Sequence, residues 1–133
     1  LMITVEMART FSHMGVDVLK LQFPIDASQN RDVAVWRAAC QQVSDVCSVP
    51  WVLLSAGVDF ETFALQARIA CESGASGVIV GRAIWNEAVT LQGNAREAFL
   101  ATTGRDRVRL LRDLCTVSAR AWTLQVTPPV STR

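Results

Sequence analysis

The sequence predicts an α/β fold in which short parallel strands alternate with helices. Three runs are almost wholly apolar and lack the alternation of a half-solvated sheet, so they predict strands buried on both faces. These runs occupy residues 16–23, 51–54 and 77–80. Ser55 follows Lys20 by 35 residues, and Arg82 follows Ser55 by 27. Both spacings are close to the roughly 30 residues of a βαβ unit.

The first half of the chain reads as helix, strand, loop and helix. A helix is predicted over residues 3–14, ending near Gly15, and Pro24 stops the first strand. A polar loop covers residues 26–32, and a second helix runs from about Val33 to Val46. Pro50 then introduces the second strand.

The second half continues this pattern. Asp59 can cap the amino end of a helix over residues 60–73, and Gly74 can close its carboxyl end. After the third strand, two or three helices are expected at about 83–92, 94–102 and 105–122, with Gly93 and Gly104 as breaks.

Regular units of one strand and one helix favour the C-terminal portion of a (β/α)8 TIM barrel, whose full length is typically about 250 residues. Three strands alone would leave two open edges and an uncovered face. We therefore expect further strands, either from residues before Leu1 or from another chain. A small flavodoxin-like sheet is the alternative, but it requires two more strands than the sequence shows. The expected division is a partial barrel domain over residues 1–126 and a disordered tail over 127–133.

Composition narrows the classes of function. The net charge is +1 and the basic residues are scattered, which argues against a nucleic-acid partner. No apolar run reaches the roughly 18 residues of a membrane span, so no membrane partner and a cytoplasmic location are expected. With one histidine and four cysteines that form no Cys-x-x-Cys pair, we expect no metal site and no cofactor. The cysteines are expected to be small hydrophobic residues in a reducing compartment. A homo-oligomer is compatible with the sequence.

Lys20 is the single lysine among 13 basic residues. Arginine cannot replace lysine where a neutral amine must act as a nucleophile, because guanidinium stays protonated in proteins. Alternation along the strand places Lys20 and Gln22 on one face. If that face lines a barrel, desolvation lowers the lysine pKa, and a neutral amine can form a Schiff base with a ketone. The alternatives are codon bias with one surviving lysine and a side chain that extends to solvent.

The turns Ser55-Ala56-Gly57 and Gly81-Arg82 follow the second and third strands, and each precedes a helix. In parallel α/β folds the site lies at the carboxyl ends of the strands, and in barrels a phosphate commonly binds after the last two. Glycine lets a phosphate approach the main chain, the Ser55 hydroxyl can donate, and Arg82 can pair with two phosphate oxygens. The two turns together therefore predict a phosphate-binding site.

Other polar residues read as structural. His13 precedes the first strand and should lie toward its amino end, away from the site. Glu61 and Glu87 are expected on solvated helix faces. The last predicted helix carries a charged face that includes Arg105, Arg107, Arg109 and Arg112, and such exposed charges contribute little individually.

Three segments, taken together and in this order, resemble the tagatose 1,6-bisphosphate aldolase family and its relative, sulfofructose 1-phosphate aldolase. They span residues 16–24, 50–58 and 72–85, and the resemblance extends from about residue 5 to Trp122. It implies that Lys20 forms the Schiff base and that the turns at Ser55–Gly57 and Gly81–Arg82 bind a substrate phosphate. Gln22 departs from the family, where glutamate is usual. The family's second lysine and its glutamate lie on earlier strands and have no counterpart here.

The resemblance implies a metal-free class I aldolase that cleaves a ketose 1-phosphate, such as tagatose 1,6-bisphosphate, into dihydroxyacetone phosphate and glyceraldehyde 3-phosphate. Sulfofructose 1-phosphate is an alternative substrate. A second alternative is a catalytically inactive half-barrel that only binds phosphate.

Overall fold

The computed structural model describes residues 1–124, so the predicted tail at 127–133 lies outside the described residues. In chain order the elements are α1 (Met2–Ser12), β1 (Leu19–Gln22), α2 (Val33–Val46), β2 (Trp51–Leu54), α3 (Phe60–Glu72), β3 (Val78–Ile79), α4 (Arg82–Trp85), the 3-10 helix η1 (Asn86–Val89), α5 (Gly93–Phe99), the π-helical η2 (Leu100–Gly104), α6 (Arg105–Ser118) and the 3-10 helix η3 (Trp122–Leu124). None of the helices within residues 1–124 is both long enough and apolar enough to cross a membrane.

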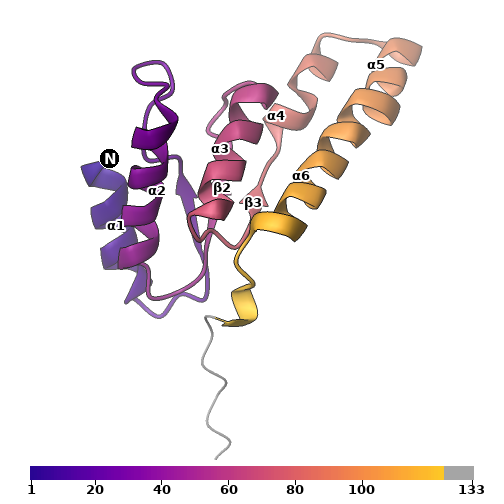
Figure 1. Cartoon of the computed structure of the whole chain (residues 1–133). Helices are drawn as coiled ribbons and strands as arrows, with labels where there is room; N and C mark the ends of the chain where they lie inside the picture. The colour runs from indigo at the N-terminus through magenta and orange to yellow at the C-terminus, as the bar shows by residue number, and fades with distance from the viewer. Residues whose placement is uncertain (125–133) are drawn as a thin grey trace, which may run out of the picture.

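The sheet is parallel, with strand order β1-β2-β3. Leu19 lies opposite Trp51, Gln22 opposite Leu54, and Leu54 opposite Ile79. Each strand is followed by a helix, so the three strands and their helices are consecutive βα units of a (β/α)8 barrel (Figure 1). The predicted fold class is confirmed.

One face of the sheet carries the core. Leu19, Leu21, Trp51 and Leu53 are buried there. Helices α2, α3 and α6 follow one another across the same side of the molecule (Figure 1), and α1 packs beside β1 and α2. Burying these large apolar side chains is the main stabilising contribution to the fold.

The opposite face has no covering element in the described part of the chain. Lys20 and Gln22 are exposed on β1, Val52 and Leu54 are half-buried on β2, and Ile79 on β3 is 48% exposed. The prediction that the strands are buried on both faces is therefore wrong for these residues, because all three large covering helices lie on one side. In a closed barrel this uncovered face would be the interior.

Local chemistry explains why most predicted boundaries are correct. The side chain of Asp32 accepts from the Ala34 N–H at 2.8 Å, and that of Asp59 accepts from the Thr62 N–H at 2.8 Å, so both helices begin at capping carboxylates. Gly74 follows α3 with φ +108°, a left-handed conformation that favours glycine.

Several bounds differ from prediction. The third strand covers Val78–Ile79 rather than 77–80, the helix expected at 83–92 is divided into α4 and η1, and the last helix ends at Ser118 rather than 122. Two further differences concern the first strand and Gly104. The first strand covers Leu19–Gln22 rather than 16–23, because its ladder with β2 begins where Leu19 lies opposite Trp51. Gly104 was expected to break the helices, yet it is buried in a continuous helix that runs from α5 through η2 into α6. The extra residue of a π turn accommodates it without ending the helix.

Candidate active site

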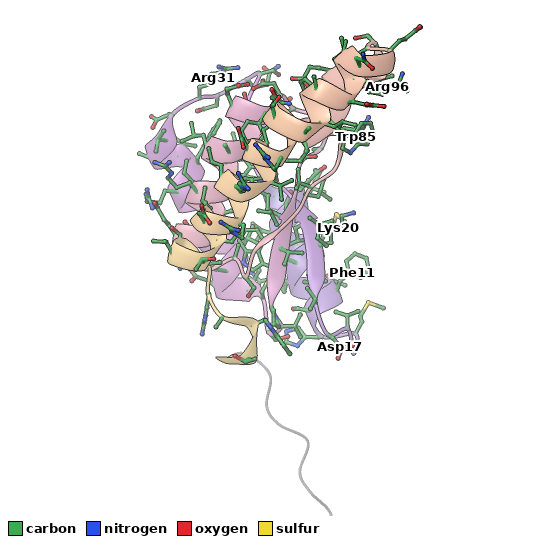
Figure 2. All side chains as sticks on the ribbon, turned by 90° about the vertical axis from the view of Figure 1, so that its right-hand side faces the viewer. Phe11, Asp17, Lys20, Arg31, Trp85 and Arg96 are labelled. Carbon is green, nitrogen blue, oxygen red and sulfur yellow. The ribbon has the colours of Figure 1, made fainter. Side chains whose placement is uncertain are left out.

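The carboxyl ends of the three strands meet at one edge of the sheet because the strands are parallel. Lys20 lies opposite Val52, three residues before Ser55, which is about 10 Å along a strand. The Lys20 side chain extends from the helix-free face of the sheet (Figure 2) and is exposed. The burial expected for this amine is therefore not provided by the described residues, although its predicted direction, away from the helices, is observed.

The turn after β2 has an unusual main chain. Ala56 and Gly57 are both left-handed, with φ +49° and +85°, and the Val58 N–H donates to the Ser55 carbonyl at 3.1 Å. The Ser55 side chain is only 8% exposed, whereas Ala56 and Gly57 are exposed. Within residues 1–124, the main-chain N–H groups of Ala56 and Gly57 have no protein acceptor. Both groups remain available to an anion.

Arg82 joins this turn to the turn after β3. A Cβ built on Gly57 would lie 3.6 Å from the Arg82 Nη2 atom, so the guanidinium rests against the bare Cα of Gly57. Arg82 is exposed and forms no ion pair with any described residue. The left-handed φ of +85° favours glycine at position 57, while an added Cβ there would make only ordinary contact with the Arg82 guanidinium.

A hollow of about 440 Å³ lies between the two turns. Its lining consists of Gly57, Val58, Asp59, Phe60, Arg82, Ala83, Asn86 and Glu87. The structure thus brings together Gly57 and Arg82 from the predicted phosphate site. Ser55, Ala56 and Gly81 flank these residues in sequence but do not line the hollow, and Lys20 lies outside it.

A second hollow of about 440 Å³ opens between the ends of β1 and β2. Gln22, Pro24, Ala56 and Gln66 are among the residues that line it. The start of α1 and the loop after β1 also line this hollow, whereas Lys20 and Arg82 do not.

Two carboxylates in the first hollow were not predicted as site residues. Hydrogen bonds from Thr62 hold the pKa of Asp59 below its ordinary value. Hydrogen bonds from Arg107, at 2.9 and 2.6 Å, hold the pKa of Glu87 below its ordinary value. Since both carboxylates are already engaged by donors, Arg82 is the charged side chain of the hollow that remains available to a ligand.

Glu87 is exposed as predicted, whereas the reading of Arg107 as a solvated surface charge was wrong. Arg107 bridges 20 residues back along the chain to Glu87, and its side chain is only 12% exposed. Helical periodicity describes neighbours three or four residues apart and carries no signal for such a contact.

His13 and the four cysteines were considered as functional residues, and none of them lines the hollow between the two turns. His13 follows α1 at the amino end of the sheet, where its Nδ1 lies 3.5 Å from the Ser48 Oγ. No group of three or more potential metal ligands occurs within the described residues. Cys40 and Cys71 are buried and Cys47 and Cys115 are partly buried; all four are free thiols.

The fold and the strand-edge arrangement define the class as a βα-barrel protein with an exposed lysine on one strand and a left-handed turn beside an arginine at the carboxyl edge of its sheet. Residues 2–87 match the sequence model of the DeoC/LacD family aldolases. The chain belongs to the DeoC/LacD aldolase family.

Curated relatives agree with this assignment. The chain is similar to "Tagatose 1,6-diphosphate aldolase 2" of Enterococcus faecalis, with 30% identity over 91% of the chain and 42% of the relative. It is also similar to the "Tagatose 1,6-diphosphate aldolase" proteins of Listeria monocytogenes, with 31% identity over 81% of the chain and 36% of the relative, and of Staphylococcus aureus, with 32% identity over 81% and 38%. The chain therefore spans about two fifths of the length of these relatives.

Proposed function

We propose that this chain supplies the Schiff-base lysine and the phosphate-binding turns of a class I aldolase that cleaves a ketose 1-phosphate. The observation that carries the proposal is the position of Lys20. The single lysine of the chain stands on the helix-free face of the sheet, one strand away from the turn where Arg82 meets Gly57. An amine and an anion site at one strand edge suit a substrate that carries both a ketone and a phosphate.

In the proposed reaction, the neutral amine of Lys20 adds to the C2 ketone and water leaves, which forms an iminium. A base removes the proton from the C4 hydroxyl, the C3–C4 bond breaks, and its electron pair neutralises the iminium as an enamine. The aldehyde departs. Protonation of C3 and hydrolysis then release dihydroxyacetone phosphate and restore the amine.

The turns at Ser55–Gly57 and Gly81–Arg82 would bind the C1 phosphate while the ketone reaches Lys20. Arg82 provides the charge, and the main-chain N–H groups of Ala56 and Gly57 provide neutral donors. Holding the ketone about 3 Å from the amine converts the addition into an intramolecular step. The Ser55 hydroxyl and the main chain at Gly81 are the further proposed contacts.

Neutralising the amine requires that the open face be covered, because Lys20 is exposed in the described chain. We propose that further barrel strands cover it and supply the base for the C4 hydroxyl. The exposure of Lys20 also favours a second candidate function, in which the chain alone binds phosphate without turnover.

Borohydride trapping separates the two functions. The protein is incubated with dihydroxyacetone phosphate and reduced with borohydride, and its mass is then measured by mass spectrometry. Lys20→Arg is the matched control. A covalent adduct on Lys20 that is absent from the control supports the aldolase. Measurable phosphate binding without an adduct favours the binding-only chain, and the absence of both contradicts the proposal.

The substrate is proposed from the names of the relatives. Tagatose 1,6-bisphosphate is preferred because the relatives are named as tagatose 1,6-diphosphate aldolases. Sulfofructose 1-phosphate, which the sequence resemblance implies, is the alternative. Cleavage assays with the tagatose, fructose and sulfofructose phosphates side by side would discriminate, and the fastest turnover should be seen with the tagatose compound. A cytoplasmic location belongs to the same proposal, since free thiols suit a reducing compartment.

A further inference from the structure

Arg107 on α6 makes contacts with the elements that follow both turns of the site. Its Nη1 donates to the Ala83 and Ile84 carbonyls at 3.3 and 3.0 Å, within the short helix that begins at Arg82. The same guanidinium forms a two-point pair with the Glu87 carboxylate. One side chain thus contacts Ala83, Ile84 and Glu87, all within the segment that begins at Arg82.

The Arg107 guanidinium also contacts α3, the helix that follows the turn at Ser55–Gly57. Its guanidinium carbon lies 4.8 Å from the ring centre of Phe60, the first residue of α3, and 5.6 Å from that of Phe99. Phe60 and Glu87 both line the hollow between the turns. Arg107 therefore spans the two walls of the hollow without lining it.

The chemistry of these contacts requires arginine. The two N–H bonds of Nη1 are shared among the Ala83 carbonyl, the Ile84 carbonyl and the Glu87 carboxylate, Nη2 donates to the same carboxylate, and the planar guanidinium also lies over two aromatic rings. A lysine ammonium cannot reproduce this planar fork. The Arg107 side chain is only 12% exposed, whereas that of Glu87 is 51% exposed, so the contacts with the Ala83 and Ile84 carbonyls are better shielded from water than the pair with Glu87. Arg105, Arg109 and Arg112 on the same helix are at least half exposed and pair only with nearby aspartates.

We infer that Arg107 is a positioning residue that fixes Arg82 against Gly57 and thereby sets the affinity of the site for the substrate phosphate. This inference rests on the proposed function, because it assigns the phosphate to the Arg82 turn. Arg107 acts through Arg82 and through the wall of the hollow, and it does not touch the substrate.

The test compares Arg107→Lys with the matched control Arg109→Lys, which changes an exposed arginine two residues away on the same helix. Affinities for inorganic phosphate and dihydroxyacetone phosphate are measured by calorimetry in the full chain. Arg107→Lys should weaken both by about tenfold or more, the scale expected when a binding group is displaced by a fraction of an ångström to an ångström. Arg109→Lys should bind as the wild type does.

A positioning role predicts a result that general destabilisation does not. Borohydride trapping of unphosphorylated dihydroxyacetone on Lys20 should be unchanged in Arg107→Lys, while trapping of dihydroxyacetone phosphate should fall. If both ketones lose the adduct equally, Arg107 is only structural and the inference is overturned. Should Arg107→Lys fail to fold, Phe99→Leu serves as the second variant, because it removes one of the two aromatic rings that lie against the guanidinium and leaves the charge of the hollow unchanged. It should lower phosphate affinity in the same direction, and unchanged affinity overturns the inference.

The proposed function and the positioning role of Arg107 can be tested separately. Wild-type protein that binds neither phosphate nor dihydroxyacetone phosphate would overturn the proposed function together with this inference. Normal binding by the wild type and equal binding by Arg107→Lys would overturn the inference alone.

Discussion

At the scale of single residues, Cys115 differs from the other three thiols of the chain. A hydrogen bond with Cys71 lowers the pKa of Cys115 to about 7, and the same contact together with burial raises the pKa of Cys71. Burial raises the pKa of Cys40 to about 12 and that of Cys47 to about 11. The thiolate is the reactive form, so partly exposed Cys115 should be the first to react.

Alkylation with iodoacetamide tests this prediction. Because a pKa of about 7 lies below the ordinary 9.0, the Cys115 thiolate accumulates as pH rises through 7, and the labelling rate should rise with it and level off by about pH 8. Cys115→Ser should remove the fast phase. Fast labelling of buried Cys40 in the native protein would contradict the assignment.

The residues of the candidate site were predictable to different degrees. Gly57 and Arg82 follow the ends of β2 and β3, which the local pattern predicts to within a residue, and the alternation along β1 places Lys20 on the helix-free face. The burial of Lys20 could not be predicted from this chain, since it depends on what covers the open face. Arg107 could not be predicted either, because its partners lie 20 to 24 residues away in sequence.

At the scale of elements, the end of α3 depends on Gly74. Its φ is +108°, and a Cβ there would lie 2.8 Å from the Ser44 Oγ, whose hydroxyl donates to the Ser73 carbonyl and accepts from the Trp51 indole at 2.9 Å. Gly74→Ala should therefore strain the backbone and push Ser44 away from both partners. We expect the free energy of unfolding to fall by about 2–4 kcal/mol.

Gly15→Ala is the matched control for denaturant titration of Gly74→Ala. Gly15 also has a left-handed φ, +77°, but a Cβ there would meet no atom within 4 Å. Gly15→Ala should lower the free energy of unfolding by about 1 kcal/mol, through backbone strain alone. Equal losses in the two variants would show that the contact with Ser44 contributes nothing.

The elements themselves followed from the sequence where local chemistry defines both ends. The helix 33–46 and the strand 51–54 have their predicted bounds, because Asp32 and Pro50 mark boundaries that require no distant partner. The first strand was predicted too long because its length depends on where β2 begins. Gly104 was misread as a break because a π turn is set by the packing of the whole helix.

At the scale of the whole molecule, we expect the open face and the two free sheet edges to determine whether the protein self-associates. Val52, Leu54 and Ile79 lie on that face without cover in residues 1–124. Exposed apolar surface of this kind favours association. The 133-residue chain should therefore associate in a concentration-dependent way in sedimentation velocity experiments.

Ile79→Lys should reduce this association, because it places a charge on the open face. Val117→Lys is the control, since Val117 is 86% exposed but lies on α6, on the helix side. If both variants associate to the same extent, or if the wild type is monomeric at all concentrations, the open face is not the surface through which the chains associate.

Whether Lys20 and the Arg82–Gly57 turn act on the same substrate can be tested by a competition experiment on borohydride trapping at Lys20. The chain has no other lysine, so peptide mapping locates a lysine adduct without ambiguity. If the amine and the Arg82–Gly57 turn serve one substrate, dihydroxyacetone phosphate should label Lys20, inorganic phosphate should suppress that labelling, and Arg82→Leu should abolish the suppression. Labelling that ignores both phosphate and Arg82, or none at Lys20, would contradict the account.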